Sequence, residues 1–206
     1  MKTFKRDAKK LRELVVYIAQ QSDLDEYFGA TKLNKVLFAA DFLAYRDLGR
    51  PITGERYQAL AWGPAPRGLL PALQELKEQN AIVEYERRLS LGAKQRRFVA
   101  LRDPDLSLFS AEEIALVDGV LKFFEKVGAK AASEWSHEFI GYKATPLTED
   151  IPYETIFVED PSLPFSPHEL VYARQLARGR SKETASNRGK PAVRKRLAAA
   201  VRKCEA

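Results

Sequence analysis

The chain has 206 residues, of which 45% are hydrophobic and 30% are charged, a balance typical of a globular protein with a sizeable core. Its longest apolar runs, such as residues 14–19, are far shorter than the roughly 20 residues needed to cross a bilayer. The same run is too short for a signal peptide, so we expect neither export nor a membrane partner. The single cysteine, Cys204, excludes an intramolecular disulfide and a multi-cysteine zinc site. We therefore expect a cytoplasmic protein without a metal or cofactor.

The net charge of +6 is unevenly distributed along the chain. Residues 173–206 contain eleven Lys or Arg and two Asp or Glu, a net charge of +9, which leaves −3 on residues 1–172. We predict one domain over residues 1–165, followed by a basic, helical C-terminal extension over 166–206. Such an extension is typical either of a nucleic-acid contact or of a solvated tail, and composition leaves both open.

Apolar residues recur at the spacing of an amphipathic helix in several segments of the chain. These segments are residues 7–21, 31–48, 68–79, the stretch between Ser110 and Gly128, and residues 129–142, 167–178 and 190–203. Gly49 and Gly128 are predicted to end the helices that precede them. Ser110 and Glu113 have the spacing of a capping box. Pro71 is compatible with the 68–79 helix because it lies in the first turn.

Two stretches between these helices carry different signals. Residues 52–62 are ambiguous between a short strand and a helical turn, and residues 63–66 are predicted to be a turn. Over residues 81–101 the apolar period changes to two, around a loop at residues 91–93, which predicts a β-hairpin. The fold class is therefore expected to be α+β and mainly α-helical, with residues 145–165 largely irregular.

The order of helix 31–48, helix 68–79 and hairpin 81–101 is that of a winged helix, in which one helix enters the major groove of DNA. The hairpin carries a basic cluster, which consists of Arg87, Arg88, Lys94, Arg96 and Arg97. In helix 68–79, by contrast, basic and acidic residues are balanced, whereas DNA-reading helices are usually more positive. A winged-helix DNA-binding regulator and a protein-binding domain with a basic hairpin both stay open at this point.

The sequence shows no complete catalytic constellation. Ser133 and His137 lie four residues apart, a spacing that brings a hydroxyl near an imidazole, but nucleophilic catalysis also needs an orienting acid and oxyanion donors. We interpret Ser133 as a helix cap and His137 as a hydrogen-bonded packing residue. Trp62 and Trp135 are interpreted as core anchors. The chain is predicted not to be an enzyme.

Three sequence blocks carry a resemblance to a known family. They are Thr31–Asp41 (TKLNKVLFAAD), Tyr57–Pro66 (YQALAWGPAP) and Ser133–Glu138 (SEWSHE) with its continuation through Gly141–Ala144 and Ile151–Glu154. In this order and at this spacing they resemble the SocA-like antitoxin family, also called the Panacea domain, over about residues 8–160. Tyr142 stands where members often carry Trp.

The resemblance implies a bacterial or phage antitoxin that binds and neutralises a toxin encoded beside it, without a cofactor. One member of the family is an adaptor that delivers its toxin to the ClpXP protease, so a ClpXP-type protease is a further candidate partner. The family-motif residues carried over, as scaffold or partner-binding residues, are Lys32, Leu33, Lys35, Trp62, Gly63, Pro64, Ser133, His137 and Pro152.

Physically, the motifs are expected to act mainly as scaffold. The helix 31–48 should pack its Leu and Val residues inward and present its lysines outward. Gly63–Pro64 should fix a turn that a side chain would obstruct, and His137 should hold the 129–142 helix against that turn. The partner surface is instead predicted on hairpin 81–101, whose edge can pair with an added strand. Its candidate residues are Val83, Tyr85, Arg96, Phe98 and Val99, with nucleic acid as the alternative partner of the basic hairpin and tail.

Overall fold

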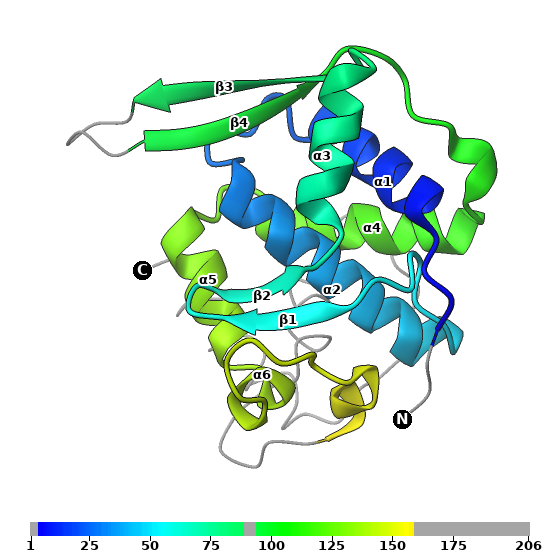
Figure 1. The fold of residues 1–206 in the computed structure, drawn as a ribbon, viewed down its shortest axis with the longest axis vertical. Coiled ribbons are helices and arrows are strands. Elements are labelled where there is room, and N and C mark those ends of the chain that lie inside the picture. The colour runs from blue at the N-terminus through cyan, green and yellow to red at the C-terminus, as the bar shows by residue number, and fades with distance from the viewer. Residues whose placement is uncertain (1–3, 89–93, 159–206) are drawn as a thin grey trace, which may run out of the picture. The chain divides into compact units, whose positions relative to one another are not determined.

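The computed structural model describes residues 4–88 and 94–158 (Figure 1). The helices are α1 (Ala8–Gln21), α2 (Ala30–Leu48), α3 (Leu69–Glu78), α4 (Ala111–Phe124), α5 (Ala129–His137) and α6 (Ile140–Ala144), with 3-10 turns η2 (Leu106–Leu108) and η3 (Tyr153–Phe157). The strands are β1 (Tyr57–Leu60), β2 (Gly63–Pro66), β3 (Ile82–Arg88) and β4 (Lys94–Ala100). They form two antiparallel pairs, β1–β2 and β3–β4, so the expected α+β fold is confirmed.

Several predicted features lie outside the described residues: the loop at residues 91–93, the boundary near residue 165, and the helices at 167–178 and 190–203. Within the described ranges, no helix is both long enough and apolar enough to span a membrane.

Helix α2 is the central element of the described region, because α1, α4, α5 and β2 all contact it. It begins after Gly29 and ends at Gly49, whose φ of +74° is the left-handed conformation typical of a helix C-terminus. With neighbours on most of its faces, α2 buries its lysines as well as its apolar residues. The expectation that Lys32 points outward is therefore wrong, since Lys32, like Lys35, is only 2% exposed.

Aromatic side chains form the core around α2. Phe38 and Phe42 of α2 have ring centroids 4.5 Å apart, and both contact Tyr57 of β1 and Phe139 at the start of α6. Trp135 of α5, interpreted as a core anchor, is half-buried and packs edge-on against Phe124, with ring centroids 5.0 Å apart.

The region around β1 and β2 differs from the sequence-based expectation. Residues 63–66 form strand β2, and the turn lies at residues 61–62. The two prolines in β2 occupy positions 64 and 66, which do not donate to β1 in the register Leu60↔Gly63 and Gln58↔Ala65. Because proline is tolerated at a strand edge, a sequence typical of a turn forms a strand here.

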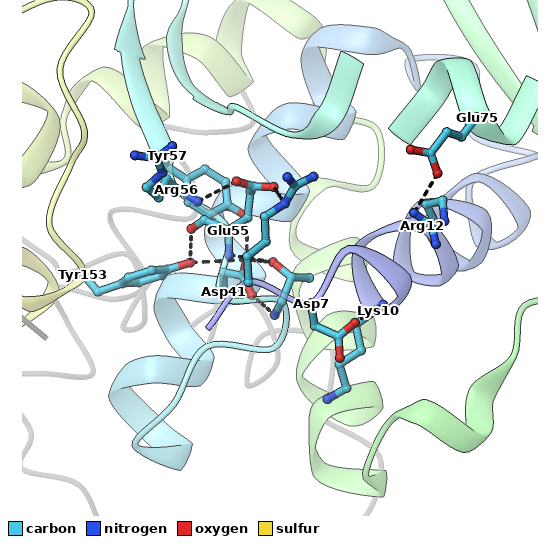
Figure 2. Close-up of polar contacts among 11 residues, drawn as sticks. Asp7, Lys10, Arg12, Asp41, Glu55, Arg56, Tyr57, Glu75 and Tyr153 are labelled. Carbon is cyan, nitrogen blue, oxygen red and sulfur yellow. Dashed lines mark hydrogen bonds and ion pairs between the residues drawn. The ribbon is translucent and has the colours of Figure 1, made fainter. Parts of the chain in front are cut away.

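A buried carboxylate joins α2 to the segment that leads into β1 (Figure 2). Asp41 is fully buried and accepts hydrogen bonds from the Thr53 N–H at 2.7 Å and from the Tyr57 hydroxyl at 2.7 Å. Tyr153 of η3 donates to the Glu55 carbonyl at 2.6 Å in the same network. Burial raises the pKa of Asp41 to about 6. This network fixes β1 relative to α2.

The remaining elements mostly follow the predicted pattern. The capping box at the start of α4 is present, with Ser110 accepting from the Glu113 N–H and Glu113 accepting from the Ser110 N–H. Helix α4 ends at Phe124, before Gly128, which instead precedes α5. The single helix predicted over 129–142 is two helices, α5 and α6, that meet around Phe139.

Candidate functional site: a clamped hairpin tip

A buried lysine, Lys35, holds the β1–β2 turn through its backbone carbonyls. Lys35 extends from α2, and its ammonium donates to the carbonyl oxygens of Trp62 at 2.5 Å and Pro64 at 3.2 Å. Burial lowers the pKa of Lys35 to about 7. The two carbonyls compensate part of the cost of burying an amine. Lys35 also occupies the Pro64 carbonyl on the outer edge of β2, so that edge offers little to an added strand.

Gly63 lies where the turn meets α2 and α5. Its φ of +92° is in the left-handed region, which disfavours any residue with a side chain. A Cβ at this position would also collide with the Ser136 hydroxyl and would lie 2.5 Å from the Lys35 ammonium. The turn therefore approaches α2 and α5 as closely as only glycine permits.

Helix α5 holds the same turn from the other side. The Ser133 hydroxyl donates to the Trp62 carbonyl at 2.8 Å, so that carbonyl has two donors. Ser133 lies within α5, and its hydroxyl bonds to the turn rather than to the end of its own helix, so its interpretation as a helix cap is wrong.

His137 packs against the turn but is not hydrogen-bonded through its buried Nε2. Its ring stacks on Tyr142 with centroids 4.8 Å apart, and its Cδ2 lies 3.2 Å from where a Cβ on Gly63 would be. Burial, together with the charge of Lys35, lowers the pKa of His137, so the ring is neutral near pH 7.

Trp62 points away from this cluster. Its backbone carbonyl is held by two donors, yet the residue is 80% exposed, the opposite of the expected core anchor. The physical reason is position: Trp62 is one of the two residues of the hairpin turn, where the chain reverses and a side chain projects outward. We call the set of Lys35, Trp62, Gly63, Ser133 and His137 the clamped tip.

The structure thus brings together six of the family-motif residues: Lys35, Trp62, Gly63, Pro64, Ser133 and His137. The other three lie elsewhere. Leu33 is fully buried in the core, Lys32 forms an ion pair with Asp25, and Pro152 directly precedes η3.

Sequence reasoning missed two residues of this site. Ser136 is fully buried against Gly63, and the Tyr142 hydroxyl donates to the Leu60 carbonyl at 2.8 Å. The signal for Ser136 was available, since positions 133, 136 and 137 lie on one face of a helix.

The candidate partner edge on hairpin β3–β4 is partly corrected. Val83 and Tyr85 are 42% and 43% exposed, and Val99 is half-buried. Phe98, however, is 1% exposed because its face of the hairpin packs on the core, so it does not belong to an exposed edge of the hairpin. Arg96 is exposed and pairs with Glu84 at 2.6 Å.

The two edges of this hairpin are not equivalent. The outer side of β4 is covered by the chain before α2: the Gln95 amide donates to the Glu26 carbonyl, and Gly29 lies against the Arg96 carbonyl. Among residues 4–88 and 94–158, no segment pairs with the outer side of β3 (Figure 1). The Leu101 N–H donates to Ala81, so the alternation of an antiparallel ladder turns the backbone groups of Glu84 and Glu86 outward. The open edge therefore belongs to β3.

Three residues of the expected basic cluster on the hairpin contact other groups of the protein. Arg97 is 4% exposed and donates to the carbonyls of Asp23 and Asp25 at 3.1 and 3.0 Å, so it holds the loop between α1 and α2. Lys94 pairs with Glu86 at 3.0 Å, and Arg96 pairs with Glu84. This arrangement gives no support to a nucleic-acid interface on the hairpin.

Comparison with known proteins identifies the family of the chain. The family model described as "Antitoxin SocA-like, Panacea domain" matches residues 33–140, more than half of the chain and a range that contains every residue of that tip. No curated protein and no solved structure matches the chain. The chain belongs to the SocA-like antitoxin family, with a Panacea domain.

Proposed function

We propose that this protein neutralises a cognate toxin in the cytoplasm by binding it directly, without catalysing a reaction, and that Trp62 is the centre of the contact. Family membership supports an antitoxin, and one observation carries the surface: a tryptophan that is 80% exposed on a turn held by Lys35 and Ser133. Tryptophan is enriched among the few residues that dominate binding energy.

The clamp supports this assignment energetically. A side chain on a fixed backbone loses less conformational freedom on binding than one on a free loop. The carbonyl of Trp62 has two donors, and Gly63 fits against α5 with no space for a Cβ, so the tip is organised before the partner arrives. The buried family-motif residues then contribute to binding indirectly, because they fix the backbone from which Trp62 projects into solvent.

Co-expression tests the proposal. The toxin encoded beside this chain is induced in the host together with wild-type protein, with Trp62→Ala, or with Leu106→Ala as a matched control. Leu106 is also an exposed apolar residue, 45% exposed, but it lies in η2. We expect Trp62→Ala to lose rescue and to weaken binding by about 30-fold, equivalent to about 2 kcal/mol. Full rescue by Trp62→Ala at equal protein level would refute the assignment of Trp62, and failure of the wild type would refute toxin neutralisation.

The open edge of β3 is a second candidate contact, since strand addition uses free backbone groups of this kind. Glu86→Pro removes one outward N–H while sparing the ladder to β4, and Glu86→Ala is the control that keeps the N–H. If the toxin adds a strand here, the proline variant alone will bind weakly. Equal binding by the two variants would remove the edge from the interface.

Delivery of the toxin to a ClpXP-type protease is the alternative form of neutralisation, supported by family membership alone. It predicts that the half-life of the toxin shortens when this protein is co-expressed, and only in cells with active ClpXP. An unchanged toxin half-life during full rescue would favour direct blocking.

A further inference from the structure

An apolar groove lies beside the clamped tip and is lined by residues of β1, β2, α3, β4 and the start of α2. It encloses about 260 Å³, and its apolar lining consists mainly of Leu60, Ala65, Leu69, Leu70, Leu73 and Phe98. Leu70 and Leu60 stand at its opening, 70% and 36% exposed. Leu60 is separated from Trp62 by a single residue, so the groove continues the surface proposed for the toxin.

The charges around this groove are unbalanced. Of the described residues that line it, Arg67 and Arg96 are the charged ones, and both are cations. Each of them shares its carboxylate with a second cation. Asp150 lies between Arg67 at 2.5 Å and Arg56 at 3.4 Å.

Arg96, the other arginine of the groove, also shares its carboxylate with a second cation. Glu84 lies between Arg96 at 2.6 Å and Lys77 at 3.0 Å. Each of these groups of ion pairs therefore contains two cations and one carboxylate, so cations outnumber the carboxylates that pair with them. An apolar floor with excess positive charge from two separate elements is complementary to an apolar segment that carries acidic side chains.

We propose that the groove binds an amphipathic segment of the toxin whose apolar side chains enter between α3 and β2 and whose flanking Asp or Glu side chains contact Arg67 and Arg96. The proposal rests on the proposed function and names the chemistry of the partner. The apolar side chains supply burial, and the acidic ones set the orientation and the salt dependence.

A pair of substitutions at Leu70 separates charge from shape. Leu70→Asp and Leu70→Lys both remove the apolar side chain at an exposed position in the first turn of α3, where acidic residues suit the helix N-terminus. Circular dichroism verifies that both variants remain folded. With an acidic partner segment, Leu70→Asp should bind the toxin at least about tenfold more weakly than Leu70→Lys, and the gap should shrink in high salt. Equal affinities, or a weaker Leu70→Lys, would overturn the proposal.

A second measurement does not depend on the toxin. Displayed random peptides of about 16 residues, long enough for four helical turns, are selected on the wild-type protein and then screened against Leu70→Asp. We expect the peptides that lose binding to the variant to combine helically spaced apolar residues with Asp or Glu. Basic peptides, or none sensitive to the substitution, would refute the groove assignment while leaving toxin neutralisation intact. If acidic peptides are selected but the wild-type protein fails to rescue the host, toxin neutralisation is refuted, while the preference of the groove for acidic amphipathic segments stands.

Discussion

Replacing Lys35 by methionine should change how the stability of the protein depends on pH. Burial lowers the pKa of Lys35 from its ordinary value of 10.5 to about 7 in the folded chain. Between these two values the unfolded chain holds a proton that the folded chain has released. Stability must therefore rise with pH across this window, because the state that binds more protons is favoured at low pH.

The size of the effect follows from the two pKa values. Between about pH 7 and about pH 9.5, the free energy of unfolding should increase by about 3 kcal/mol through Lys35 alone, at 1.36 kcal/mol per pKa unit. Other perturbed groups titrate outside the window. The pKa of Asp41 is about 6, that of His137 is lowered from 6.5, and those of Tyr57 and Tyr153 are raised above 10.

Urea unfolding at the two pH values measures the prediction. Wild type, Lys35→Met and Lys130→Met are compared, because Lys130 is a lysine whose side chain is 91% exposed. The rise in unfolding free energy should be nearly the same for wild type and Lys130→Met, and smaller by about 3 kcal/mol for Lys35→Met. A Lys35→Met variant with the wild-type pH dependence would show that burial in the clamped tip does not lower the pKa of Lys35.

Three further predictions concern the scaffold. Gly63→Ala should lower stability by more than about 1 kcal/mol in thermal melts, since its φ is +92° and its Cβ would collide with Ser136; an unchanged melting temperature would contradict the close approach. Arg97→Met should destabilise the protein by about 1–3 kcal/mol, because it removes the hydrogen bonds by which the buried Arg97 side chain holds the carbonyls of Asp23 and Asp25, while Arg96→Met should have little effect. Deleting residues 180–206 should leave near-UV circular dichroism unchanged, since the chain is polar over residues 179–189, where the deletion begins; a molten spectrum would refute this.

Local patterns predicted most of the elements. The apolar period of 3.6 located α1, α2 and α3, and Ser110 marked the start of α4 through a capping box. The period of two predicted hairpin β3–β4, in which the structure buries Ile82 and exposes Val83. These features depend on neighbours in sequence, which is why sequence alone contains them.

The clamped tip was not predictable in the same way. Lys35 is buried because carbonyls nearly thirty residues away compensate its amine, and a hydropathy pattern assigns every lysine to the surface. Trp62 is exposed for the converse reason, since pattern rules place tryptophan inside and take no account of its position in a turn. Arg97 was assigned to a basic surface, but it reaches carbonyls of a loop more than seventy residues earlier in the chain. The errors at Lys35 and Arg97 arise from contacts distant in sequence, and the error at Trp62 arises from its position in the turn.

Fluorine NMR of the protein labelled with 5-fluorotryptophan most directly tests whether Trp62 is the centre of the toxin contact. The sequence contains two tryptophans, Trp62 and Trp135, and a Trp135→Phe variant assigns their two signals. Trp62 is exposed at the turn, whereas Trp135 is half-buried against Phe124 and serves as an internal control. On titration with the toxin, we expect the Trp62 signal to shift or broaden while the Trp135 signal stays in place. A complex that forms while the Trp62 signal remains unchanged would contradict this expectation.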